Sequence, residues 1–224
     1  MNTEAFAGKS KAYVQARPSY PDAAIDYIRT LAPQDAIFAD IGAGTGIFTE
    51  LIAKYGNEIF AVEPNRDMRE TLANALTIYP NVKVVNGSAE CTTLPDNSTD
   101  VIVCAQALNW FNIRSFRAEC RRIGKIGCIA IVIYNRVPGI NKELRNKQST
   151  DAFFSKPTVK EFANPIMYDS EKWLLYMSSH AGVPLPDEAG YSEYVAEVNA
   201  LFERESVGGL LRLDVVTNVF SEAI

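Results

Sequence analysis

This sequence has very little histidine and no cluster of basic residues. It contains one histidine, His180, and 22 Lys and Arg that lie scattered among 27 Asp and Glu. A formal net charge of −5 without a basic stripe offers no electrostatic footprint for a polyanion, so we expect no nucleic-acid partner. His180 lies in MSSHAG near the expected end of a helix, a position that suits a partly charged imidazole rather than a catalytic one.

Long apolar runs and metal-ligand spacings are also missing. No stretch approaches about 18 uninterrupted apolar residues, and the opening segment has no apolar core of signal-peptide length. We therefore expect a cytoplasmic protein with no membrane partner. No C-x-x-C pair occurs, so we expect reduced structural thiols and no metal. The cysteines are Cys91, Cys104, Cys120 and Cys128.

Apolar runs of strand length alternate with amphipathic stretches over residues 36–134. The runs lie at 37–41, 59–62, 82–85, 101–105 and 128–133. Between them, apolar residues recur at helical spacing, as in Met68, Leu72 and Leu76. The alternation predicts an α/β fold in which right-handed crossovers place helices on both faces of a parallel sheet.

Two segments fall outside this alternation. Residues 1–30 carry aromatic, basic and proline side chains, and we expect them to form a lid over the core at 31–134. Residues 135–160 are polar and mixed in character, which predicts an inserted cap. Residues 161–224 return to order, with strands expected at 161–168 and 210–220 and helices at 170–180 and 191–205. We expect these elements to complete the sheet.

A glycine-rich turn follows the first predicted strand directly. In DIGAGTG, residues 40–46, the glycines permit a tight turn and a close approach of the backbone to a nucleotide-like ligand. The second predicted strand ends at Glu63, 21 residues after Gly42, where a carboxylate suits a ribose diol. The alternative is a tight turn without a ligand.

The third glycine discriminates between two cofactors. A dinucleotide fingerprint requires glycine at position 47, which is Ile47 here, whereas this turn places it at Gly46. That spacing, with Asp40 two residues before the first glycine, favours a ligand without a pyrophosphate, such as S-adenosylmethionine (SAM). A nicotinamide or flavin cofactor, and with it an NAD-dependent oxidoreductase, is the less favoured alternative.

Four stretches resemble successive motifs of the class I SAM-dependent methyltransferases: FADIGAGTGIFTELIA, AVEPNRDMRETL, NGSAECTTLPDNSTDVIV and AQALNWF. Together with the opening YVQARPSYP they resemble most closely the methyltransferase type 11 group, which includes trans-aconitate methyltransferase-like enzymes. The resemblance implies a Rossmann-like sheet, mostly parallel with an antiparallel last strand, plus a small cap. It also implies SAM as cofactor and S-adenosylhomocysteine (SAH) as product.

The resemblance also implies which residues surround the cofactor. Asp40 and the glycine-rich backbone would line its methionine part, and Glu63 would accept both ribose hydroxyls. The other implied contacts are Tyr13, Arg17, Gly42, Ala43, Gly44, Gly46, Pro64, Met68, Ser88, Ala89, Glu90, Gln106 and Ala107. Three of these side chains also fit a role without a ligand. Met68 could equally be a core residue, Glu90 a solvated surface charge and Arg17 an exposed arginine.

No general base is evident near the expected site, and no catalytic residue can be assigned. Related enzymes often carry histidine where this chain has Asn109, which takes no proton at neutral pH. The remaining candidates are Tyr13, Tyr20 and Arg136, the last as a contact for an acidic acceptor. An already ionised carboxylate needs no base, whereas a hydroxyl or amine usually does.

We therefore expect an enzyme, monomeric or homodimeric, that methylates a small molecule, favouring a carboxylic acid. Proximity and desolvation would drive an in-line displacement. The alternative is a non-catalytic SAM-binding regulatory module.

Overall fold

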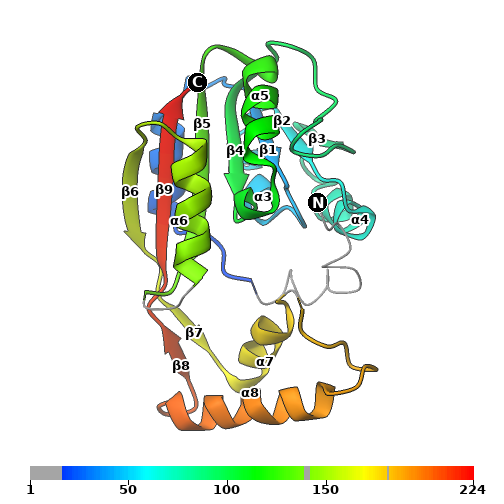
Figure 1. Ribbon diagram of the computed structural model, residues 1–224, viewed down its shortest axis with the longest axis vertical. Helices are drawn as coiled ribbons and strands as arrows, with labels where there is room; N and C mark the ends of the chain where they lie inside the picture. The colour runs from blue at the N-terminus through cyan, green and yellow to red at the C-terminus, as the bar shows by residue number, and fades with distance from the viewer. Residues whose placement is uncertain (1–16, 139–141, 181) are drawn as a thin grey trace.

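The computed structural model describes residues 17–138, 142–180 and 182–224, and within 142–146 only the backbone. Tyr13 and most of the expected lid lie outside the described residues. Figure 1 shows a layered α/β unit above a small lobe that faces the carboxyl edge of its sheet. Among the described residues, no helix has the length and apolar character that crossing a membrane would require.

A seven-stranded sheet with the order β3-β2-β1-β4-β5-β9-β6 forms the centre of the molecule. Strands β1 to β5 pair in parallel, and β9 runs antiparallel to both of its neighbours, β5 and β6. The bounds are β1 (Phe38–Ile41), β2 (Ile59–Val62), β3 (Val82–Val85), β4 (Thr99–Ala105), β5 (Gly124–Arg136), β6 (Thr158–Ala163) and β9 (Val216–Ala223). The expected α/β sheet with an antiparallel last strand is confirmed.

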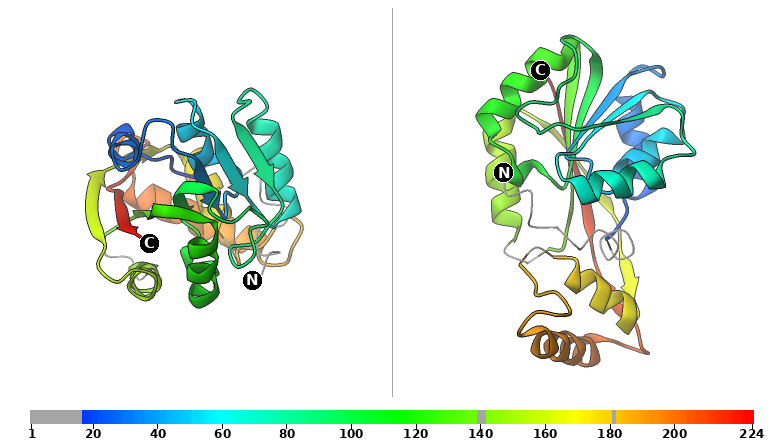
Figure 2. Two further views of the ribbon diagram at one scale, coloured as in Figure 1. Left: turned by 90° about the horizontal axis from the view of Figure 1, so that it is seen from above. Right: turned by 90° about the vertical axis from the view of Figure 1, so that its right-hand side faces the viewer.

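Helices cover both faces of this sheet (Figure 2). On one face lie α2 (Asp22–Thr30), α3 (Ile47–Ala53) and α4 (Arg66–Ala75), and on the other α5 (Ile113–Ile123) and α6 (Lys142–Phe153). A short helix, η1 (Leu108–Trp110), follows β4. Helix α5 shows why these stretches are helical, since Phe116, Cys120 and Ile123 form one buried stripe and the side chain of Asn112 caps the first turn.

The expectation of an inserted cap at 135–160 is wrong. The segment contains the end of β5, all of α6 and the beginning of β6, so it belongs to the sheet and its covering layer. Phe153 and Phe154, at the end of α6, are buried in the core, and the Phe153 ring stacks on Phe116 at 5.1 Å. These two aromatic residues anchor a helix that is otherwise polar and only weakly amphipathic.

The part of the described chain that lies apart from the sheet is residues 164–215, between β6 and β9. We call this segment the small lobe. It consists of β7 (Ile166–Tyr168), α7 (Ser170–Ser178), α8 (Tyr191–Glu205) and β8 (Leu211–Leu213). Its core is separate from that of the sheet and is built from Tyr168, Trp173, Val198, Phe202 and Leu211. The two chain crossings into the small lobe lie together, because the amide of Asn164 donates to the carbonyl oxygen of Val215 at 2.8 Å.

Candidate cofactor site at the carboxyl edge of the sheet

The loop from β1 to α3 turns through three glycines with positive φ: +72° at Gly42, +59° at Gly44 and +92° at Gly46. A Cβ on Gly42 would lie 2.9 Å from the Cβ of Ala107, and one on Gly46 would lie 2.6 Å from Cδ1 of Leu72. A Cβ on Gly44 would meet no atom of the described residues within 4 Å. Gly42 and Gly46 therefore make room for the side chains of Ala107 and Leu72. Of the three glycines, only Gly44 borders open space among the described residues.

Glu63 holds this loop from the end of β2. Its carboxylate accepts the amides of Gly44 and Asn65, each at 2.8 Å, and the residue is only 7% exposed. Burial raises the pKa of Glu63, against the lowering effect of the two amides and of Arg69. Because each carboxylate oxygen can accept a second hydrogen bond, Glu63 can still receive two hydroxyl groups.

Asp40 lies beside it at the end of β1 and is 1% exposed. Its Oδ2 accepts the hydroxyl of Thr49 at 2.6 Å, whereas its buried Oδ1 has no hydrogen-bond partner among the described residues. Burial and, to a smaller extent, the negative charge of Glu63 raise the pKa of Asp40 to about 7, against the lowering effect of the Thr49 hydrogen bond. The two neighbouring strand ends thus present a pair of buried carboxylates, an environment that attracts a cation.

The third part of this edge is the end of β4. Gln106 has φ +60°, an uncommon conformation for a residue with a Cβ. The backbone amide of Gln106 donates to the carbonyl oxygen of Ile133 at 3.0 Å. The side-chain amide of Gln106 donates to the carbonyl oxygen of Asn135 at 3.4 Å. Strained residues of this kind cluster at functional sites. Ala107 follows, against Gly42, and Asn109 has a buried Oδ1 that no described residue bonds.

The loop after β3 brings Ser88, Ala89 and Glu90 to the same edge. Ala89 is buried, and Ser88 pairs with Cys91 in an isolated bridge. Glu90 accepts the amide of Asn112 at 2.8 Å, so its carboxylate is engaged at the beginning of α5.

Pro64 and Met68, which both follow β2, differ in how deeply they are buried. Met68 is buried on α4 and its amide donates to the Asn65 side chain, which agrees with a core position for Met68. Pro64 is half-buried, and its carbonyl oxygen accepts from Arg69 at 2.9 Å.

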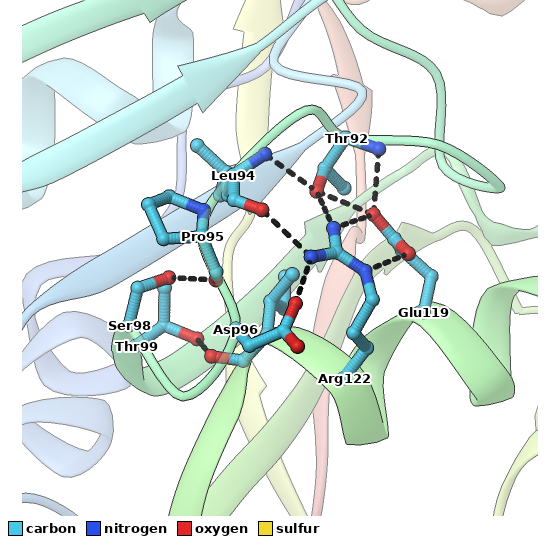
Figure 3. Close-up of polar contacts among 9 residues, drawn as sticks. Thr92, Leu94, Pro95, Asp96, Ser98, Thr99, Glu119 and Arg122 are labelled. Carbon is cyan, nitrogen blue, oxygen red and sulfur yellow. Dashed lines mark hydrogen bonds and ion pairs between the residues drawn. The ribbon is translucent and has the colours of Figure 1, made fainter.

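A partly buried ion pair holds the loop between β3 and β4 against α5 (Figure 3). Arg122 donates to Glu119 at 2.7 and 2.9 Å and to Asp96 at 2.6 Å. The other hydrogen bonds of the Glu119 carboxylate come from the amide and hydroxyl of Thr92, at 2.7 and 2.6 Å. Arg122 also donates to the carbonyl oxygen of Leu94 at 2.8 Å. These contacts lower the pKa of Glu119 to about 2.

Two of the remaining sequence candidates, Tyr20 and Arg136, contact other side chains of the sheet and its covering layer. Tyr20 is a core residue, 7% exposed, whose ring meets Phe48 edge-on at 5.9 Å, and its catalytic role stays a prediction. Arg136 donates to Glu161 at 3.0 Å and to Asn218 at 3.1 Å across β5, β9 and β6.

Arg17 points to the small lobe rather than to the glycine-rich loop. It donates to the carbonyl oxygen of Ser179 at 3.1 Å, and its guanidinium lies 5.8 Å from the ring centre of Tyr176. His180, on the same lobe, contacts the Tyr176 ring at 4.9 Å, and its Nδ1 lies 3.1 Å from the carbonyl oxygen of Met177.

Sequence reasoning missed Asn135, which lies near the carboxyl end of β5. Its side chain contacts residues 18 and 19, Asn164 and Thr217. The only sequence signal for it is an amide at the carboxyl end of a predicted parallel strand, a place where polar residues meet ligands. Among the described residues, no group of three or more His, Cys, Asp or Glu is arranged to hold a metal ion.

The sequence of this region matches a family model described as a methyltransferase domain, over residues 39–132. Residues 39–132 are therefore similar to a methyltransferase domain. The matched residues run from β1 into β5 and include the glycine-rich loop, Glu63 and Gln106.

Relatives of this domain occur in fungi and bacteria. An uncharacterised methyltransferase-like protein of Schizosaccharomyces pombe is 36% identical over 137 residues, which are 58% of this chain and 52% of that protein. The matching part thus spans about half the length of that relative. An uncharacterised methyltransferase of Mycobacterium tuberculosis is 28% identical over 192 residues, 83% of this chain and 76% of that protein.

Solved structures share the fold at lower identity. A proposed type II methyltransferase from Anaeromyxobacter dehalogenans superposes with a TM-score of 0.66 at 20% identity, covering 92% of this chain and 97% of that one. The [4+2]-cyclase SpnF superposes with a TM-score of 0.60 at 15% identity, covering 98% and 93%. The chain therefore has the class I methyltransferase fold, and SpnF shows that a protein described by a different reaction shares this fold.

Proposed function

We propose that the protein transfers the methyl group of SAM to the carboxylate of a small molecule. The observation that carries the cofactor assignment is the pair of buried carboxylates, Asp40 and Glu63, beside the open space at Gly44. Glu63 would receive the ribose hydroxyls, and the unpartnered Oδ1 of Asp40 would face the ammonium of the methionine part. The Gly44 backbone would lie against the cofactor.

The charge of this pair favours SAM over a dinucleotide. SAM brings a sulfonium and an ammonium, which two buried carboxylates attract. A dinucleotide would bring two phosphate charges to the same loop, beside the carboxylate of Asp40, and like charges at low dielectric repel. The position of Gly46, one residue short of the dinucleotide spacing, agrees with this.

Bound SAM would supply a methyl group already activated by its sulfonium. The protein then has to align the acceptor and exclude water rather than to move a proton. Among the described side chains near the edge, Tyr134 and Asn109 do not suit the role of base, because burial raises the pKa of Tyr134 above its usual range and Asn109 does not titrate. An acceptor that is ionised at neutral pH fits these surroundings.

The cofactor assignment is tested by titration calorimetry with SAM, SAH and NADH. We expect SAM and SAH to bind with a Kd on the order of micromolar, and NADH not to bind. Replacing Glu63 with Ala should abolish binding. Glu58→Ala is the control, because Glu58 precedes the same strand at its other end and forms only an exposed pair with Lys83. NADH binding without SAH binding would overturn the assignment.

The acceptor class is tested by incubating the protein with methyl-labelled SAM and a panel of small mono- and dicarboxylic acids. Methyl esters of carboxylates hydrolyse in mild alkali and release labelled methanol, whereas N-methyl and ether products do not. Alkali-stable label in the product would contradict a carboxylate acceptor. Tight SAH binding without transfer to any acid in the panel would favour the alternative of a non-catalytic SAM-binding module.

A further inference from the structure

Asn135 joins three segments that meet at the carboxyl edge of the sheet. Its Nδ2 donates to the carbonyl oxygens of Ser19 and Pro18, at 3.0 and 3.3 Å. Its Oδ1 accepts the hydroxyl of Thr217 at 2.5 Å and the side-chain amide of Asn164 at 3.3 Å. The carboxamide therefore makes four hydrogen bonds, two as a donor and two as an acceptor. No other side chain of this size can reproduce two donors and two acceptors.

The three segments have different places in the molecule. Pro18 and Ser19 lie at the beginning of the described chain, which runs between the sheet and the small lobe (Figure 1). Asn164 belongs to one chain crossing into the small lobe, and its side chain also donates to the carbonyl oxygen of Ser19 at 2.9 Å. Thr217, fully buried on β9, follows the other crossing.

The backbone of Asn135 extends this connection to the candidate cofactor site. Its carbonyl oxygen accepts the side chain of Gln106, the strained residue at the end of β4. Asn135 thus connects the opening segment and the chain crossings into the small lobe with the part of the edge where the methyl group would be presented. Asn135 carries no charge, so it acts through geometry alone.

We propose that Asn135 is a positioning residue for methyl transfer, which holds residues 17–20 and the small lobe in register with Gln106. The inference rests on the proposed function. Asn135 does not itself contact the reacting groups. Without its four side-chain hydrogen bonds the sheet still folds, but the small lobe and the opening segment are held less firmly over the site rather than released, because the contacts of Asn164 with Ser19 and of Arg17 with Ser179 remain.

The test compares Asn135→Asp with Asn81→Asp. Asn81 is a matched control, because its Nδ2 also donates to two backbone carbonyl oxygens, those of Ala53 at 3.0 Å and Asn57 at 2.7 Å. It precedes β3 and so lies at the opposite, amino edge of the sheet. Each substitution replaces two amide donors with a carboxylate that repels carbonyl oxygens, so the two variants should lose similar stability.

We expect only Asn135→Asp to lower kcat/KM for the acceptor, by about tenfold, as the loss of two partly buried hydrogen bonds allows. Hydrogen exchange in the ligand-free protein should accelerate in peptides covering residues 17–21 and 164–168. Asn81→Asp should leave both quantities near the wild-type values. Thr217→Val, which removes one donor to Oδ1 without changing side-chain size, is the second variant if Asn135→Asp does not fold, and we expect about a threefold loss.

Unchanged exchange in Asn135→Asp, or a loss of kcat/KM equal to that of Asn81→Asp, would overturn the inference. If Asn135→Asp does not fold, wild-type kcat/KM in Thr217→Val would overturn it. Failure of the wild-type protein to bind SAH would instead overturn the proposed function, so the two failures are distinguishable.

Discussion

At the scale of single residues, the three glycines of the β1–α3 loop differ in what their missing side chain permits. Gly42 and Gly46 leave room for Ala107 and Leu72, which pack the loop against η1 and α4. Gly44 leaves space that none of the described residues fills. In this glycine-rich loop, Gly42 and Gly46 therefore serve packing, whereas Gly44 leaves access for a ligand.

Replacing Gly44 or Gly42 with Ala separates these roles experimentally, because both residues have positive φ and incur similar backbone strain of about 1–2 kcal/mol. We expect Gly42→Ala to lose about 1–3 kcal/mol more, since its Cβ would lie 2.9 Å from that of Ala107. Gly44→Ala should remain the more stable variant but bind SAH more weakly. Urea unfolding and calorimetry measure the two effects. Wild-type SAH affinity in Gly44→Ala would show that the open space is not the cofactor cradle.

Asp40 makes stability depend on pH in the opposite direction from most carboxylates. Its pKa rises on folding from 3.8 to about 7, so between these values the folded protein binds more protons than the unfolded chain. Its contribution is therefore most favourable below about pH 4 and is lost as the pH rises towards 7. We expect Asp40→Asn, which keeps an acceptor for Thr49, to raise the Tm relative to wild type more at pH 8 than at pH 5. A pH-independent difference would contradict the raised pKa.

At the scale of elements, the loop between β3 and β4 is held by charge rather than by apolar packing alone. Glu119 and Arg122 lie on α5, and their partners Thr92, Leu94 and Asp96 lie on the loop (Figure 3). The Glu119 side chain is 8% exposed and that of Arg122 is 36% exposed. This pair therefore fixes the loop that carries Ala89 towards the candidate site.

Glu119→Gln should destabilise the protein at pH 7 by about 2–3 kcal/mol, less than a fully buried pair because Arg122 is partly solvated. The pKa of Glu119 falls on folding from 4.5 to about 2. Its stabilisation is therefore complete above about pH 4.5 and is lost as the pH falls towards 2. Urea unfolding at pH 7 and pH 3 should show the difference between variant and wild type shrinking at the lower pH. A difference that is constant with pH would argue against the ion pair.

At the scale of the whole molecule, the small lobe is an insertion between two paired strands. Ala163 and Val216, the last and first residues of β6 and β9 at the crossings, face each other in the antiparallel ladder. The small lobe has its own apolar core, which includes Trp173 and Phe202. The sheet can therefore close without it.

Joining Ala163 to Val216 through an Asn-Gly turn should convert β6 and β9 into a hairpin and leave the sheet folded. We expect the shortened protein to unfold cooperatively and to bind SAH more weakly than the full chain. It should transfer no methyl group, because the acceptor would no longer be enclosed. Circular dichroism, calorimetry and the labelled-methyl assay measure these outcomes. A shortened protein that aggregates or unfolds without cooperativity would show that the small lobe is part of the core.

The sequence by itself determined the parallel sheet, the helices beside it, the glycine-rich turn and the carboxylate that ends β2. Local signals suffice for these, because apolar periodicity, a turn motif and a strand end are written within a few consecutive residues.

Only the tertiary structure decided the place of α6, the position of the small lobe and the direction of Arg17. The same holds for Asn135, whose partners Gln106, Thr217 and Pro18 lie 29, 82 and 117 residues away in the chain. Such contacts depend on which distant segments the folded sheet brings to one edge, and no local pattern records that.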